Sequence, residues 1–327
     1  MDRDDIQGIV LHGYRSLPFA RYHLLSFGTG QPRQVLARLV TDTSSGDEAR
    51  ATSRHQLALS APGLAALGLS QAALAQFSRE FRQGMAHPER SAALGDVAQE
   101  APENWEFGGP QTPALDALCM TFAGSHEQRD ELSGARERLF ERFGVSFRSY
   151  DALALEAGSD AWELGRARRF RRRTQPPLGE FVLGERDAVG ERTRGPFVPV
   201  KYGTRPLPDW SRSERALNFG QNGSYLVIRK LIPAATLDAE AHAQVVTAYA
   251  QRALGSEQDF THRLLGRSRR LEDGLWFMAL NASIRRQFEF LQPSVRSDPA
   301  PGFRVRGGAY FFLPSIRALN YLAEPGG

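Results

Sequence analysis

Three strings in the last third of the chain carry most of the information about its fold. Residues 221–231 read QNGSYLVIRKL, residues 264–267 read LLGR, and residues 274–292 read GLWFMALNASIRRQFEFLQ. Short apolar runs inside the first and third strings, at 225–231 and 275–280, are typical of buried strands. Only residues 268–273 separate the second string from the third.

The rest of the chain alternates strands with helices. In the first half, strands are predicted at 22–27, 55–60, 113–122 and 145–155, and helices at 32–40, 62–67, 70–81 and 127–143. In the second half, strands are predicted at 225–231, 275–280 and 309–313, with helices at 237–254 and up to about Arg267 and a loop-rich stretch at 185–222. This alternation lacks regular βαβ spacing, so it favours antiparallel sheets backed by helices.

Further strings extend the pattern over nearly the whole chain. They are DIQG at 5–8, HGY at 12–14, FRQGM at 81–85, WEFGGP at 105–110, GEFVLG at 179–184 and VRGGAYFFLP at 305–314. In this order, the strings resemble those of dye-decolourising (DyP-type) haem peroxidases. The resemblance implies an α+β fold of two ferredoxin-like domains with antiparallel sheets, a dimeric α/β-barrel, with haem between the halves. It places an N-terminal domain at 1–142, an Arg-rich connecting region at 143–178 and a C-terminal domain at 179–327.

The parts of that family that hold and activate iron have no counterpart here. In the family, a long segment with the haem-ligating histidine and a distal arginine lies between the second and third strings, where this chain has only residues 268–273. The family also has a Gly-x-x-Asp-Gly motif before the GEFVLG string. Here Asp160 follows Gly158 by two positions and precedes Ala161. We therefore expect no haem and no peroxidase activity, and a pseudoenzyme that assembles as a homo- or hetero-oligomer with a DyP-like relative.

Two other functions stay open. A haem-free enzyme would use acidic residues near the altered loops, of which Asp160, Glu163, Glu272 and Asp273 are the candidates. A haem peroxidase with a non-standard iron ligand would use His262, the histidine nearest in sequence to the shortened segment. The seven histidines are His12, His23, His55, His87, His126, His242 and His262. No two of them have the spacing of a metal site, so no metal centre is expected.

The positive charge of the chain comes almost entirely from arginine. Lys201 and Lys230 are the two lysines, and the net charge is +4. Six arginines crowd one short run, namely Arg166, Arg168, Arg169, Arg171, Arg172 and Arg173. Such a run either binds an anionic ligand or acidic partner, or remains solvated. One aromatic residue within it is too few for a stacking platform, which disfavours nucleic acid.

Composition limits the class of protein. The 327 residues are 41% hydrophobic and 24% charged, as in ordinary globular proteins. No uninterrupted apolar window is long enough to cross a membrane. The acidic start of the chain is unlike a secretory leader, and Cys119 is the single cysteine, in an apolar run typical of a buried thiol. We therefore expect a cytoplasmic protein without disulfides.

Overall fold

The computed structural model describes most of the chain. The described residues are 2–46, 51–154, 177–193, 195–199, 216–234, 261–296 and 303–324. The strands are β1 (Phe19–Ser26), β2 (Ser53–Leu59), β3 (Ala117–Ala123), β4 (Ser146–Ala152), β5 (Phe197–Pro199), β6 (Ala216–Asn218), β7 (Ser224–Pro233), β8 (Leu265–Gly266), β9 (Arg269–Leu271), β10 (Gly274–Asn281) and β11 (Phe303–Leu313).

Helices alternate with these strands. The α-helices are α1 (Gly8–Leu11), α2 (Pro32–Asp42), α3 (Ala61–Ala66), α4 (Gln71–Leu74), α5 (Arg79–Gln83), α6 (Pro88–Leu94), α7 (His126–Arg142), α9 (Phe290–Arg296) and α10 (Ile316–Ala323). Three short 3-10 turns are η1 (Ala98–Glu100), η2 (Pro102–Asn104) and η4 (Leu178–Glu180), and η5 (Ile284–Glu289) is a π-helix. Among the described residues, no helix is both long and apolar enough to cross a bilayer.

The two halves of the main sheet repeat one strand order. In the first half the order is β4-β1-β3-β2, and in the second it is β11-β7-β10-β8, with β9 also paired to β10. If β8 and β9 are counted as one position, each half has the order last, first, third and second strand of that half. All these pairings are antiparallel. The prediction of two ferredoxin-like halves with antiparallel sheets is confirmed.

The halves are joined at both ends of the sheet. On one side, β2 pairs with β11 through Leu59 and Phe312. At the far ends, the backbone N–H of Leu153, just after β4, donates to the carbonyl of Arg270 in β9 over 2.8 Å. The sheet therefore curls back on itself and nearly closes into a barrel.

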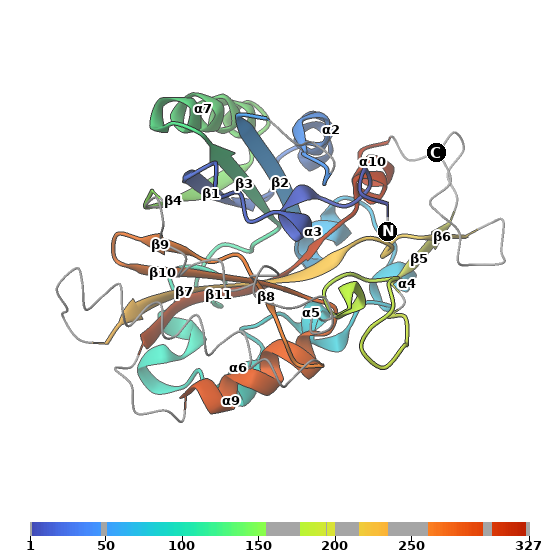
Figure 1. The fold of residues 1–327 in the computed structure, drawn as a ribbon. Helices are drawn as coiled ribbons and strands as arrows, with labels where there is room; N and C mark the ends of the chain where they lie inside the picture. The colour runs from blue at the N-terminus through green and yellow to red at the C-terminus, as the bar shows by residue number, and fades with distance from the viewer. Residues whose placement is uncertain are drawn as a thin grey trace.

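A second set of side chains is buried inside this barrel. Alternate residues of each strand point inward, as the pleat requires. They include Tyr22 of β1, Phe122 of β3, Ile228 of β7 and Trp276 of β10. The rings of Tyr22 and Trp276 are stacked with centroids 5.1 Å apart. The other faces of the strands meet the helices, with α7 and α2 on one side of the molecule and α6 and α9 on the opposite side (Figure 1).

The N-terminal segment ties the halves together with buried hydrogen bonds. The side-chain amide of Gln7 donates to the carbonyls of Leu57 over 2.7 Å and Pro314 over 2.8 Å. One carboxylate oxygen of Asp5 accepts from Asn222 over 2.8 Å, and the other accepts from the backbone of Arg317 over 2.9 Å. Burial raises the pKa of the Asp5 carboxyl despite these bonds.

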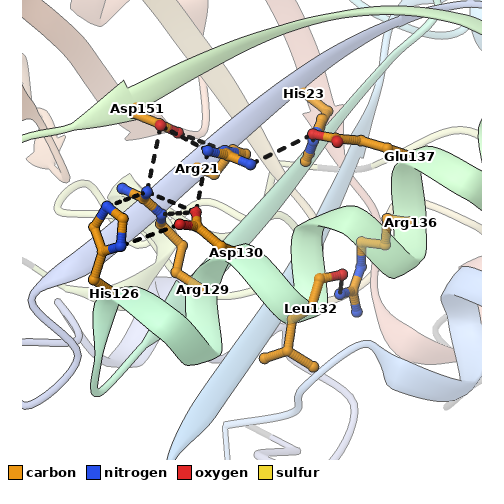
Figure 2. A network of polar contacts seen from close by, with 9 residues as sticks. All are labelled: Arg21, His23, His126, Arg129, Asp130, Leu132, Arg136, Glu137 and Asp151. Carbon is orange, nitrogen blue, oxygen red and sulfur yellow. Dashed lines mark hydrogen bonds and ion pairs between the residues drawn. The ribbon is translucent and has the colours of Figure 1, made fainter.

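Ion pairs hold α7 against the outer face of β1 and β4 (Figure 2). Arg21 of β1 is the centre of this network. Its guanidinium donates to Asp151 of β4 over 2.5 Å and 2.7 Å, and lies 3.2 Å from Asp130 and 3.6 Å from Glu137, both on α7. The neighbouring His23 is fully buried and lies 2.9 Å from the same Glu137 carboxylate.

A half-buried histidine beneath α7 makes the first half sensitive to acid. Burial, and the nearby charges of Arg136 and Arg54, lower the pKa of His55 to about 3. In the unfolded chain this pKa is about 6.5, so the unfolded state binds more protons below that pH. The contribution of this histidine to the free energy of unfolding is therefore complete above pH 6.5. It is lost as the pH falls towards 3, by at most about 1.4 kcal/mol per pH unit.

We expect His55→Gln to flatten this pH dependence of the unfolding free energy. The measurement is urea unfolding followed by circular dichroism between pH 4 and pH 7. His126→Gln, on the exposed end of α7, is the matched control and should keep the wild-type profile. An unchanged slope in His55→Gln would show that other groups control acid stability.

Several local predictions are confirmed and one is wrong. The strands predicted at 55–60, 225–231 and 275–280 are present as β2, β7 and β10. Cys119 is buried, and burial raises the pKa of its thiol. The helix predicted to end near Arg267 is wrong: described residues 261–271 form a turn and the strands β8 and β9, because pairing with β10 outweighs local helical preference. The tight turn predicted after it is present.

Other local predictions are modified or stay untested. The helix predicted at 70–81 is divided into α4 and α5, and the loop-rich stretch at 185–222 contains β5 and β6. The helix predicted at 237–254 lies outside the described residues. The domain boundaries stay predictions, and β4, inside the proposed connecting region, pairs with β1.

Candidate functional site

The shortened segment forms a β-hairpin. Residues 269–271 are β9, Glu272 and Asp273 make the turn, and β10 follows at once. Asp273 is within 2.6 Å of the ammonium group of Lys230 on β7, and Glu106 lies 2.9 Å from the same ammonium on its other side. These two carboxylates raise the pKa of Lys230, although burial opposes the shift. The Asp273–Lys230 ion pair therefore holds the turn against β7.

Aromatic rings fill the barrel beside this hairpin. Trp276 is fully buried, and its ring centroid lies 5.0 Å from that of Tyr150 and 5.4 Å from that of Phe107. Phe107 can reach this position because Gly307 faces it: a Cβ at Gly307 would lie only 2.6 Å from the Phe107 ring. Arg269 closes the other side, with its guanidinium 5.6 Å from the Phe122 ring centre and hydrogen bonds to the carbonyls of residues 13 and 14.

A cluster of buried charges lies on the other face of the second half, under the π-helix and α9. Arg229 of β7 is 1% exposed and pairs with Asp96, whose side chain is fully buried. Arg229 also donates to Gln292 of α9 over 3.1 Å. Buried ions are costly unless they are paired and hydrogen-bonded, so each partner depends on the other.

A second buried pair lies in the same layer. Arg90 of α6 is 2.9 Å from Glu289 at the end of the π-helix, and the hydroxyl of Tyr310 on β11 donates to Glu289 over 3.0 Å. Burial raises the pKa of the Glu289 carboxyl, and burial beside that carboxylate raises the pKa of Tyr310 well above its usual value.

The π-helix itself is fixed by one glutamine. The Gln287 amide nitrogen donates to the carbonyls of Glu180 over 2.8 Å and Arg263 over 2.6 Å. Its oxygen accepts from the backbone of Ala282 over 3.1 Å and Ser283 over 2.9 Å. π-Helices are rare and are found frequently at functional sites. The π-helix therefore favours a functional site in the second half of the chain.

A pocket opens near the buried charges. It encloses about 200 Å³ between the start of α3, the end of α5, residues 108–115 and residues 308–310 of β11. Tyr310 lines it and connects it through its hydroxyl to Glu289. The other lining groups are mainly apolar side chains and glycine backbone.

His262 lies outside the barrel. Its Nδ1 donates to the carbonyl of Arg286 over 2.6 Å, and its ring stacks on Phe290 with centroids 3.9 Å apart. Because a carbonyl can only accept, the neutral ring must carry its proton on Nδ1, which leaves Nε2 as the free ligating atom. Phe290 is 57% exposed, so this ring pair faces the surface.

The sequence-predicted site residues are only partly placed. Asp160, Glu163 and the arginine run at 166–173 lie outside the described residues, as does His242. Asp273 and His262 have different surroundings. Asp273 is ion-paired to Lys230 at the hairpin, and His262 is stacked on Phe290 of α9. In the described part of the chain, no group of three or more His, Cys, Asp or Glu side chains could hold a metal ion.

The residues that sequence reasoning missed are the buried ion pairs. Asp96 and Arg229 are 133 positions apart, and Arg90 and Glu289 are 199 apart. No local spacing identifies such partners. Glu289 and Gln287 did have a signal in the sequence, since both belong to the string at 274–292. For polar residues in that string, structural hydrogen bonding is the simplest interpretation.

Several solved structures have a fold similar to that of this chain. A DyP-type peroxidase of Anabaena sp. is similar with a TM-score of 0.65 and 15% identity, over 98% of this chain and 94% of that one. A DyP-type peroxidase of the fungus Auricularia auricula-judae is similar with a TM-score of 0.66 and 15% identity, over 99% of both chains. The chain has the fold of the DyP-type peroxidases. No family model matches its sequence, and no curated protein matches it.

Against the DyP-type fold, the space between the two halves does not fit haem in the described structure. Tyr22, Phe107 and Trp276 are each at most 2% exposed and pack ring against ring in that space. Of the described histidines, His23 is buried and His55 half-buried beneath α7, on the outer face of the sheet and not between the halves, and burial lowers the pKa of both.

Proposed function

We propose that this chain is a DyP-fold protein that works without haem and without peroxidase activity. The observation that carries the proposal is the β9–β10 hairpin: residues 268–273, where the resemblance leads us to expect a long haem-holding segment, contain only β9 and a two-residue turn. Its Trp276 side chain occupies the space between the halves. A protein built in this way supports binding and assembly rather than peroxide chemistry.

The proposed role is that of a pseudoenzyme that assembles with a second DyP-fold chain, either its own copy or a relative. Loss of the iron site removes the need to keep an open channel between the halves. Of the two described acidic candidates for haem-free catalysis, Asp273 has its carboxylate engaged by the Lys230 ammonium at 2.6 Å, and Glu272 lies beside it in an exposed turn rather than in a pocket. Binding is therefore favoured over a repurposed active site at this turn.

We expect the purified protein to carry no stoichiometric haem after expression with a haem precursor. The measurements are the Soret absorption, iron content and peroxide-dependent dye oxidation. The Auricularia auricula-judae peroxidase, expressed in parallel, is the positive control. Stoichiometric haem together with dye oxidation would contradict the proposal.

One observation favours the alternative, a haem protein with a non-standard ligand. His262 donates from Nδ1 to a backbone carbonyl, which is the arrangement that fixes ligating histidines in metal proteins. His262 would then hold the iron through Nε2, at the surface rather than between the halves. If haem binds, His262→Ala should abolish its Soret band and His12→Ala should not.

A further inference from the structure

The 200 Å³ pocket beside β11 has a closed apolar floor and an open mouth. Phe81, Met85 and Tyr310 line it and are buried, with exposures of 1 to 3%. The exposed residues Arg82, Pro113 and Ala114 also line it and mark the side from which a ligand would enter. The pocket belongs to neither the hairpin nor the space between the halves.

Its size suits a single aromatic ring. An apolar cavity of about 150 Å³ is large enough to bind benzene. At about 200 Å³, this pocket has room for one substituted ring. Aromatic, sulfur and proline side chains on its walls are the surfaces against which a flat apolar ring packs well.

The mouth carries a fixed positive charge. The Nε of Arg82 donates to the carbonyl of Phe77 over 3.2 Å, which anchors the guanidinium at the end of α5. Within the described ranges no carboxylate forms an ion pair with Arg82. Glu89, which accepts from the adjacent Gln83, is already paired with Arg79 and Arg90, each at 2.6 Å. The terminal nitrogens of Arg82 are therefore available to an anion.

We infer that this pocket binds a small aromatic carboxylate, with the ring on the Phe81–Tyr310 floor and the carboxylate on Arg82. A guanidinium matches a carboxylate with two parallel hydrogen bonds, and it remains charged at any physiological pH. The ring buries apolar surface that acetate lacks, and the carboxylate gains a charged contact that a neutral amide lacks. Both parts of the ligand are needed.

The test uses 4-fluorobenzoate and fluorine NMR on the full-length protein. We expect saturable binding at one site, at least tenfold weaker binding of 4-fluorobenzamide, and no competition by acetate at equal concentration. Arg82→Gln should weaken 4-fluorobenzoate at least tenfold, and Ala114→Phe, which fills the mouth from an exposed position, should abolish binding. Arg79→Gln, on the same helix but outside the pocket, is the matched control and should bind like the wild type.

Three results would overturn the inference. They are no saturable binding by the wild type, equal binding of the acid and the amide, and binding unaffected by both pocket variants. The comparison of ligands on the wild type needs no mutation, so it decides the question even if a variant folds poorly. None of these results depends on haem, so the inference and the proposed function can fail separately.

Discussion

Trp276→Ala should lower the free energy of unfolding by about 3 to 5 kcal/mol, the range for large aromatic side chains removed from cores. Trp276 is fully buried at the centre of the barrel and contacts the rings of Tyr22, Phe107 and Tyr150. These rings belong to the first half, to a connecting loop and to β4, so their packing joins the two halves. Removing the indole leaves a cavity that surrounding strands cannot collapse into.

The measurement is equilibrium unfolding in urea followed by far-ultraviolet circular dichroism and tyrosine fluorescence. Val97→Ala, at a side chain that is 60% exposed, is the control and should change stability by less than about 0.5 kcal/mol. If Trp276→Ala is as stable as this control, the rings do not pack as described and the space between the halves is open. The haem-free proposal would then lose the support that it takes from the packing of Trp276 and would rest on the β9–β10 hairpin alone.

Asp96→Ala should be nearly as damaging, at about 3 to 5 kcal/mol, because it leaves the Arg229 charge buried without its main counter-ion. Arg229 is 1% exposed and Asp96 is 2% exposed, so water cannot replace the lost partner. Replacing both residues by apolar ones, as in Asp96→Ala with Arg229→Met, should recover much of the loss since no charge then remains buried.

A double-mutant cycle measured by urea unfolding tests this coupling. The control is the exposed pair Arg79–Glu89, with side-chain exposures of 63% and 43%, where Arg79→Ala should cost at most about 1 kcal/mol. Additive effects of Asp96→Ala and Arg229→Met would contradict direct pairing. They would place the stabilising contacts of Arg229 elsewhere.

The sequence predicted those parts of the fold that depend on local pattern. The apolar runs at 225–231 and 275–280 identified β7 and β10, which are buried on both faces and so need a continuous apolar run. The strands β8 and β9 were missed because they are two and three residues long and exist only by pairing with β10. Ordered family-like strings predicted the two-halved architecture.

The candidate site was less predictable, since its contacts join distant parts of the chain. The arginine-rich run and the acidic residues Asp160 and Glu163 stood out by composition, but they lie outside the described residues. Lys230 stood out only as one of two lysines, and its two carboxylate partners come from positions 106 and 273. Arg82 belongs to the quoted string at 81–85, but nothing in that string indicated a binding role, because its significance comes from the pocket that α5 forms with residues of three other segments.

The two-residue turn between β9 and β10 is also a natural point of insertion. Glu272 and Asp273 are both exposed, whereas Leu271 and Gly274 on either side are buried and paired with each other. Chain added between Glu272 and Asp273 would leave and re-enter through solvent, and the cost of closing a flexible loop grows only slowly with its length. A guest peptide or a whole domain could be displayed there while the barrel keeps its strand register.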